Sequence, residues 1–184
     1  MSPQPQIIPR DDPRYPARLR QRLGTDAPAE LTALGNLDLL SQPMTALFCS
    51  ARCPGNVILR AYDQAARWRD TGHCVISGFH SPVEKECLRI LLRGEPPIII
   101  CPARAMPKCI APELRTPFAA GRLLILSAFG PSKTHITADL AARRNAVVSA
   151  LATEALVLHS TPGGRLEASL RQNPLPLHAN EIHH

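Results

Sequence analysis

Short apolar runs alternate with amphipathic stretches through most of this chain, and this alternation constrains its fold more than any other feature. Five runs read as strands, at 45–50, 73–77, 96–102, 122–127 and 154–160. Between and after them lie helical patterns at 54–72, 81–94, 137–152 and 164–172. Strands that alternate with helices form βαβ units, and continuous apolar strands are typical of a parallel sheet buried on both faces. The sequence therefore predicts an α/β fold with a mainly parallel sheet.

The length of 184 residues suits one domain with a small appendage. We assign residues 1–42 to an N-terminal arm and extension, of which 1–12 are expected to be a loose arm, and 43–184 to the main domain. No apolar run is long enough to span a bilayer, and the first residues lack the apolar stretch of a signal peptide. We expect a cytoplasmic protein without a membrane partner.

The formal net charge is +6 and the pI about 9.3, and arginine supplies nearly all of the positive charge. Arginine suits phosphate, so a polyanionic partner is one explanation, and the arginine preference of a GC-rich genome on solvated faces is the other. Aromatic residues make up only 4% of the chain, which limits base stacking. The six cysteines form no CxxC pair and read as reduced, buried small hydrophobes, so we expect neither a metal nor a cofactor.

Ligands of such folds bind beyond the carboxyl ends of the strands. This rule selects the loops at 50–55, 77–82, 101–110, 127–137 and 159–165. In the second loop, Ser77-Gly78 ends an apolar run and Ser81 and Glu84 have the spacing of a capping box. Gly78 would allow a close approach of an anion to the positive end of the next helix. A tight turn explains Ser77-Gly78 equally, and capping explains Glu84 fully.

Three later features lie at the same predicted edge of the sheet. Lys133 stands in a small, polar loop, where it either reaches an anion or is simply solvated. Arg143 and Arg144 precede Asn145, and because adjacent residues cannot share a helix face, at most one arginine is expected to point at the site. Gly163-Gly164 precede the last helical pattern, where any turn would use glycine. No catalytic set stands out, since the histidines and cysteines have no triad spacing.

Several motifs in order resemble those of the DprA/Smf DNA-processing family over about residues 13–178. They are YPARL (15–19), PAELTALGNLDLL (28–40), VISG (75–78), LLRG (91–94), LILS (124–127), RRNAVVSALA (143–152) and LVLHSTPGGRL (156–166). The resemblance implies a three-layer, Rossmann-like fold with a short N-terminal extension. It also implies single-stranded DNA binding in a basic pocket, a homodimer, and a recombinase partner, since family members help load RecA. Carried over by position, the binding residues are Arg52, Ser77, Gly78, Arg144, Asn145 and Gly164, to which Lys133 and Gly163 are added from the loops.

The chain departs from the family pattern at several motif positions. Ser50 and Ala51 replace the Gly and Ser of GSR, Ala128 replaces the Glu after the second motif serine, and Ala146 replaces the second Arg of RNR. The related phosphoribohydrolases use PGGxGTxxE, and here Leu166 stands where that motif has its third Gly. We therefore predict a non-enzymatic, DprA-like binder of single-stranded DNA. The alternatives are a sensor of a nucleotide-like small molecule, a nucleoside-monophosphate phosphoribohydrolase, and a scaffold whose pocket no longer binds.

Overall fold

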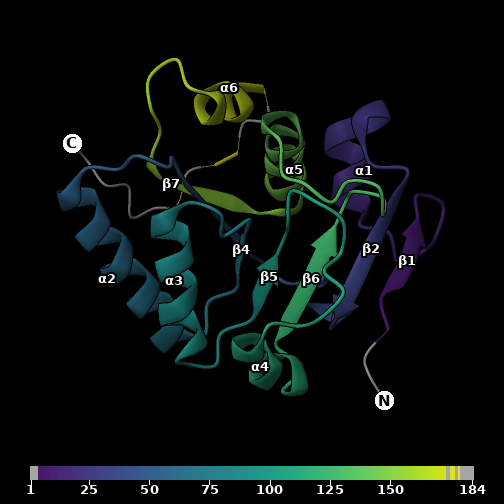
Figure 1. Cartoon of the computed structure of the whole chain (residues 1–184), viewed down its shortest axis with the longest axis horizontal. Helices are drawn as coiled ribbons and strands as arrows, with labels where there is room; N and C mark the ends of the chain where they lie inside the picture. The colour runs from purple at the N-terminus through teal and green to yellow at the C-terminus, as the bar shows by residue number, and fades with distance from the viewer. Residues whose placement is uncertain (1–3, 173–174, 177, 179–184) are drawn as a thin grey trace.

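The structure, a computed structural model, describes residues 4–172, 175–176 and 178 and has an α/β fold (Figure 1). Its strands are β1 (Gln6–Pro9), β2 (Glu30–Gly35), β3 (Thr45–Cys49), β4 (Val75–Ser77), β5 (Ile98–Ile100), β6 (Leu123–Ser127) and β7 (Glu154–His159). Its α-helices are α1 (Ala17–Leu23), α2 (Gly55–Thr71), α3 (Pro82–Leu92), α4 (Arg115–Ala119), α5 (Ala138–Leu151) and α6 (Arg165–Gln172). Short 3-10 helices are η1 (Gly24–Asp26), η2 (Leu37–Ser41) and η3 (Pro112–Leu114).

The strands form one sheet in the order β1-β2-β6-β5-β4-β3-β7. The pairs β6–β5, β5–β4, β4–β3 and β3–β7 are parallel, whereas β1–β2 and β2–β6 are antiparallel. The mainly parallel sheet predicted from the apolar runs is therefore confirmed.

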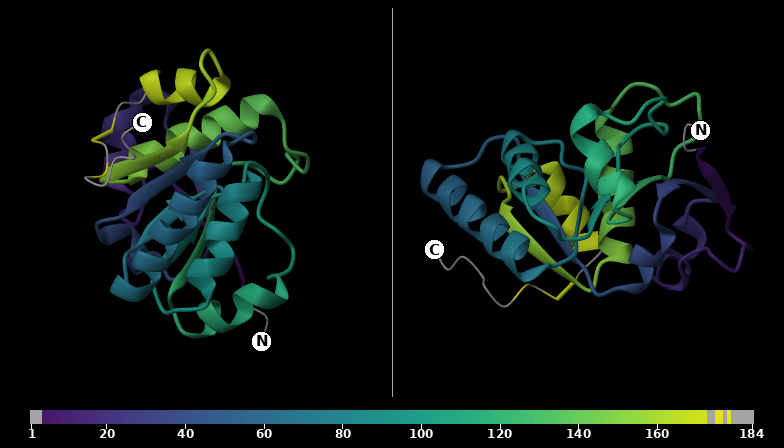
Figure 2. Two further views of the ribbon diagram at one scale, coloured as in Figure 1. Left: turned by 90° about the vertical axis from the view of Figure 1, so that its left-hand side faces the viewer. Right: turned by 90° about the horizontal axis from the view of Figure 1, so that it is seen from below.

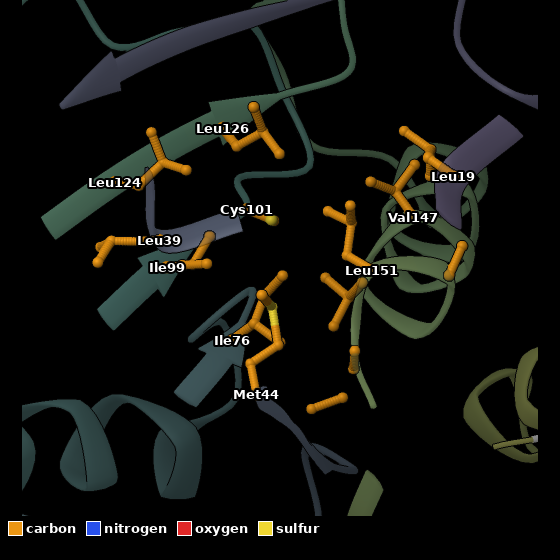
Figure 3. Packing of buried hydrophobic residues seen from close by; sticks show 14 of the residues in the cluster. Leu19, Leu39, Met44, Ile76, Ile99, Cys101, Leu124, Leu126, Val147 and Leu151 are labelled. Carbon is orange, nitrogen blue, oxygen red and sulfur yellow. The ribbon is translucent and has the colours of Figure 1, made fainter. Parts of the chain in front are cut away.

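Helices cover both faces of the sheet and make three layers (Figure 2). On one face, α1 and α5 pack on the strands through a buried cluster that includes Leu19, Val147 and Leu151 (Figure 3). On the other face, α2 and α3 contribute a second cluster with Trp68 and Leu91. The two clusters use alternate residues of the same strands, which is why each of these strands reads as a continuous apolar run.

Four of the six cysteines belong to these layers, as predicted. Cys49, Cys74, Cys87 and Cys101 are buried. Burial raises the pKa of the Cys74, Cys87 and Cys101 thiols to about 12, so these thiols stay protonated and unreactive. Cys53, near the end of the loop between β3 and α2, is half-buried.

The N-terminal segment is better ordered than its sequence indicates. We predicted a loose arm over residues 1–12, but Gln6–Pro9 pair with β2 as the edge strand of the sheet, with Ile8 fully buried. Arg22 of α1 also donates from Nη1 to the carbonyl oxygen of Ala152 (2.6 Å), just beyond the end of α5. The strand signal was missed because four residues with one buried side chain show no periodicity. The boundary near residue 42 stays a prediction.

No helix among the described residues is long and apolar enough to cross a membrane.

A polar cluster closes the amino ends of β3 and β7. The Thr45 hydroxyl donates to Glu154 Oε1 (2.7 Å) and lies 2.6 Å from His73 Nε2. His178 Nδ1 lies 2.6 Å from the same carboxylate oxygen. The indole ring of Trp68 stacks on His73, with 5.6 Å between ring centroids. Burial, and then the proximity of His178, lower the pKa of His73 below its ordinary value.

This cluster predicts a pH dependence of stability. Because folded His73 takes up a proton less readily than unfolded His73, the free energy of unfolding should fall as the pH drops through about 6.5. His73→Gln should flatten this fall. Urea denaturation between about pH 8 and pH 5, followed by the fluorescence of Trp68, the single tryptophan, measures it. An identical pH dependence in the variant and the wild type would contradict the role of His73.

Candidate functional site

The sheet order creates a topological switch point between β3 and β7. The chain passes from β3 through β4 and β5 to β6 in one direction, and β7 then returns to the other side of β3. The loops after these two strands touch there, since Thr161 N–H donates to Ser50 Oγ (3.2 Å). The structure therefore brings the loop that carries exposed Arg52 beside the Gly163–Gly164 turn, in the crevice where ligands of open α/β sheets bind.

The glycine turn itself is fixed by local contacts. Gly163 has a φ of 69°, which favours glycine, and its N–H donates to Glu167 Oε2 (2.6 Å). A Cβ on Gly164 would lie 2.7 Å from the carbonyl oxygen of Thr161. The turn geometry thus requires both glycines, and the Gly163 N–H already has an intramolecular acceptor.

Arg144 is a buried cation beyond the carboxyl ends of β4 and β5. Only 6% of it is exposed, and none of the ion pairs among the described residues includes it. Its Nη1 donates to the Cys101 carbonyl oxygen (3.3 Å) and its Nε to Asn145 Oδ1 (2.7 Å). Burial lowers the pKa of the Arg144 guanidinium, and the charge of Glu84 opposes that shift. A buried guanidinium keeps its proton, so the site holds a positive charge without a contact partner of opposite sign.

Gly78 makes room for this arginine. A Cβ built on Gly78 would overlap Nη1 of Arg144. The glycine that ends the VISG motif is therefore needed because the guanidinium lies directly over its backbone. Sequence reasoning placed both residues at the site but assigned the close approach at Gly78 to a ligand.

Glu84 occupies the start of α3, as the capping interpretation predicted. The Ser81 side chain accepts from Glu84 N–H (3.2 Å), and Glu84 Oε2 accepts from Ser81 N–H (3.1 Å) and from His80 N–H (2.8 Å). Glu84 Oε1 also accepts from Cys49 N–H (2.9 Å) at the end of β3. The carboxylate thus already accepts from three backbone N–H groups, of Cys49, His80 and Ser81, beside the start of α3.

Two serines at strand ends play the same structural part. Ser77 Oγ donates to the Leu47 carbonyl oxygen (2.8 Å) and accepts from Phe79 N–H (3.1 Å), which holds Phe79 at a φ of 45°. Ser127 Oγ donates to the Arg104 carbonyl oxygen (2.7 Å) and accepts from a backbone N–H two residues on. Ser77 is fully buried, so its hydroxyl stabilises the backbone at the end of β4 and is not exposed to a ligand.

A hollow of about 610 Å³ opens beyond β4 and β5, and we call it the Arg144 pocket. Arg144 and Gly78 line its inner wall, and Ile100 and Ile125 form part of an apolar wall. Its other basic lining residues are Lys85, Arg104 and Arg115. Sequence analysis included Arg104 only as part of the 101–110 loop and missed Lys85 and Arg115, because both lie on helices whose orientation the sequence does not fix.

The remaining predicted residues do not line this pocket. Asn145 is half-buried and orients Arg144 through the hydrogen bond to its Nε. Lys133 is exposed, and its carbonyl oxygen accepts from Ala105 N–H (2.7 Å), which joins the loops after β5 and β6. Neither residue lines the Arg144 pocket, nor do Arg52, Gly163 and Gly164. Among the described residues, no three His, Cys, Asp or Glu side chains are arranged to hold a metal ion.

The sequence model described as DNA recombination-mediator protein A matches residues 6–166. The chain belongs to this family.

Two solved structures of family members have the same fold. DNA processing protein A (DprA) from Streptococcus pneumoniae is 18% identical, with a TM-score of 0.69 over 91% of this chain and 60% of that protein. The Helicobacter pylori DNA processing protein A, from a study of its single-stranded DNA binding mode, is 19% identical, with a TM-score of 0.72 over 97% of this chain and 83% of that one. This chain thus spans less than two thirds of the pneumococcal protein. No curated protein sequence matches it significantly.

The resemblance to the DprA family is therefore confirmed, and with it the Rossmann-like, three-layer fold. The individual binding residues carried over from the family pattern stay predictions.

The Glu84 contacts predict a structural rather than a ligand-binding role. Glu84→Ala would leave three backbone N–H groups without their acceptor and should lower the free energy of unfolding by about 3 kcal/mol. Glu86→Ala, which removes a carboxylate of the same helix that pairs with exposed Arg89, should cost less than about 1 kcal/mol. Urea denaturation of both variants measures the difference, and equal losses would refute the assignment.

Proposed function

We propose that this protein binds single-stranded DNA at the carboxyl ends of its parallel strands, with Arg144 and Arg52 contacting phosphates. The observation that carries this proposal is the buried, unpaired charge of Arg144 on the wall of a 610 Å³ pocket. A desolvated cation with no carboxylate at ion-pair distance among the described residues favours an incoming anion. Family membership, and a relative whose study describes single-stranded DNA binding, support the same choice.

The lining of the Arg144 pocket fits the chemistry of a single strand. Lys85, Arg104 and Arg115 carry positive charge, and the isoleucines of β5 and β6 offer an apolar wall. A single strand has charged phosphates and bases with apolar faces, so it matches such a mixed surface better than a simple anion does. Contacts of this kind bind the sugar-phosphate backbone of the DNA and do not distinguish between base sequences. A homodimer and a recombinase partner, which the resemblance implies, remain predictions.

A nucleotide-like small molecule is the second candidate ligand. The volume of the Arg144 pocket lies within the range of small-ligand sites, about 300–1,000 Å³. A mononucleotide such as AMP would then bind the pocket alone and be little affected by Arg52, which lies outside it. Competition between AMP and a labelled oligonucleotide distinguishes the two candidates.

The DNA proposal is tested by fluorescence anisotropy across a range of salt concentrations. Each phosphate contact to a single strand contributes about 0.7 to the slope of log affinity against log salt. Arg52→Ala and Arg144→Gln should each weaken binding and flatten this slope by about 0.7, equally for unrelated sequences. We choose Gln at position 144 because the site is buried and an alanine would leave a void.

Arg89→Gln is the matched control for this titration. Arg89 is an exposed arginine of α3 that pairs with Glu86 and does not line the Arg144 pocket. Its loss should leave both affinity and slope unchanged, and melting temperatures of all variants separate lost binding from lost folding. If the wild type shows no salt-dependent binding to single strands at low micromolar protein, the DNA proposal fails.

We also expect no hydrolysis of AMP. The carboxylates at the starts of α3 and α6 are held by backbone donors: Glu84 by Ser81 N–H, and Glu167 by Gly163 N–H. Neither is free to serve as a general acid or base. Chromatography should find no adenine released from AMP. Adenine release in proportion to protein, abolished by Glu167→Ala, would overturn this expectation.

A further inference from the structure

The two adjacent arginines of α5 line two different hollows. Arg144 is buried in the Arg144 pocket, whereas Arg143 is exposed and lines a groove of about 970 Å³ on the other side of the helix. We call this second hollow the Arg143 groove. Its walls come from the segment around η1, from α5 and from α6. Figure 1 shows α1, α5 and α6 on the same face of the sheet.

Two departures from the family pattern lie in this groove. Ala128 stands where the pattern has Glu, and Ala146 stands where it has the second Arg of RNR. Both alanines line the Arg143 groove. This chain therefore has small, neutral side chains in the groove where the pattern has one acidic and one basic side chain.

The charges that remain in the groove come from different elements. Arg22 belongs to α1, Arg143 to α5 and Arg165 to α6, and Asp26 and Asp139 are also in the lining. Arg22 Nη1 is engaged with carbonyl oxygens at the end of α5. Arg143 and Arg165 are exposed and are thus the two cations best placed to contact a polyanion.

A small apolar cluster borders both hollows. Ala103, which lines the Arg144 pocket, forms a small apolar cluster with Leu140 and with Phe129, which lines the Arg143 groove. The guanidinium of Arg143 lies over the Phe129 ring, 5.6 Å from its centroid. A chain molecule that leaves the Arg144 pocket therefore has a short path over this cluster to Arg143.

We propose that the Arg143 groove is a second binding surface for the sugar-phosphate backbone, which takes up the same single strand that enters the Arg144 pocket. The inference rests on the proposed function and extends its footprint. Arg143 and Arg165 contact phosphates there, while Asp26 and Asp139 keep the attraction moderate. The strand then lies on both sides of the N-terminal half of α5.

Strand length separates the two surfaces in an experiment. An oligonucleotide of about 4 nucleotides should occupy the Arg144 pocket alone, and one of about 16 should reach both hollows. For the longer strand, the double variant Arg143→Gln/Arg165→Gln should bind roughly tenfold more weakly at low salt. Two lost contacts at about 0.7 each should flatten its salt slope by about 1.4. Binding of the shorter strand should not change.

Two further variants control for nonspecific charge effects. Arg171→Gln removes an exposed arginine of α6 that pairs with Glu167 and does not line the groove, so it should leave binding of both strands unchanged. Ala128→Glu places a carboxylate in the lining of the groove and should weaken binding of the longer strand only, whereas Ala128→Gln, of the same size but neutral, should weaken it less. Melting temperatures show whether each variant is folded.

The outcomes separate this inference from the proposed function. If the double variant binds only the longer strand more weakly, the Arg143 groove is supported as a second binding surface. If the double variant binds both strands like the wild type, or if its affinity for both strands falls equally, the groove is not a separate binding surface. The proposed function stands in either case. If the wild type binds neither strand, the proposed function and this inference both fail.

Discussion

The carboxylate of Glu84 holds together the part of the molecule on which the site depends. It accepts hydrogen bonds from the end of β3 and from the loop between β4 and α3, so one side chain fixes two neighbouring strand ends. Its negative charge also favours the charged form of buried Arg144, because it opposes the effect of burial on the pKa of that guanidinium. The carboxyl edge of a parallel sheet concentrates backbone donors and a helix dipole, and an internal anion satisfies them here before any ligand arrives.

What remains for a ligand is positive charge. Arg144 lies over Gly78 and is oriented by Asn145, and its acceptors within the described part of the chain are a carbonyl oxygen and an amide oxygen. Burial of such a cation is unfavourable unless the fold or a ligand compensates it. The arrangement therefore resembles a preformed anion site whose rigid parts, the strand ends and the capped helix, are stabilised independently of the ligand.

Local patterns predicted the elements well and the site only in part. The apolar runs and the capping box at Ser81 and Glu84 depend on residues near one another in the chain, so their prediction succeeded. The bond from Glu84 to Cys49 N–H spans 35 residues and has no local signal. Helical periodicity indicated that Arg143 and Arg144 face different ways, but only the packing of α5 against the sheet decides which one is buried. The contribution of Lys85 to the pocket likewise depends on how α3 lies on the sheet.

A crystal structure of the protein with a short single-stranded oligonucleotide tests the central claim most directly. The account predicts a group of the oligonucleotide within hydrogen-bond distance of the Arg144 guanidinium, with Glu84 still bound to the N–H groups of Cys49, His80 and Ser81. An oligonucleotide bound only to surfaces away from the carboxyl ends of the strands, with Arg144 unchanged and out of contact, would contradict it.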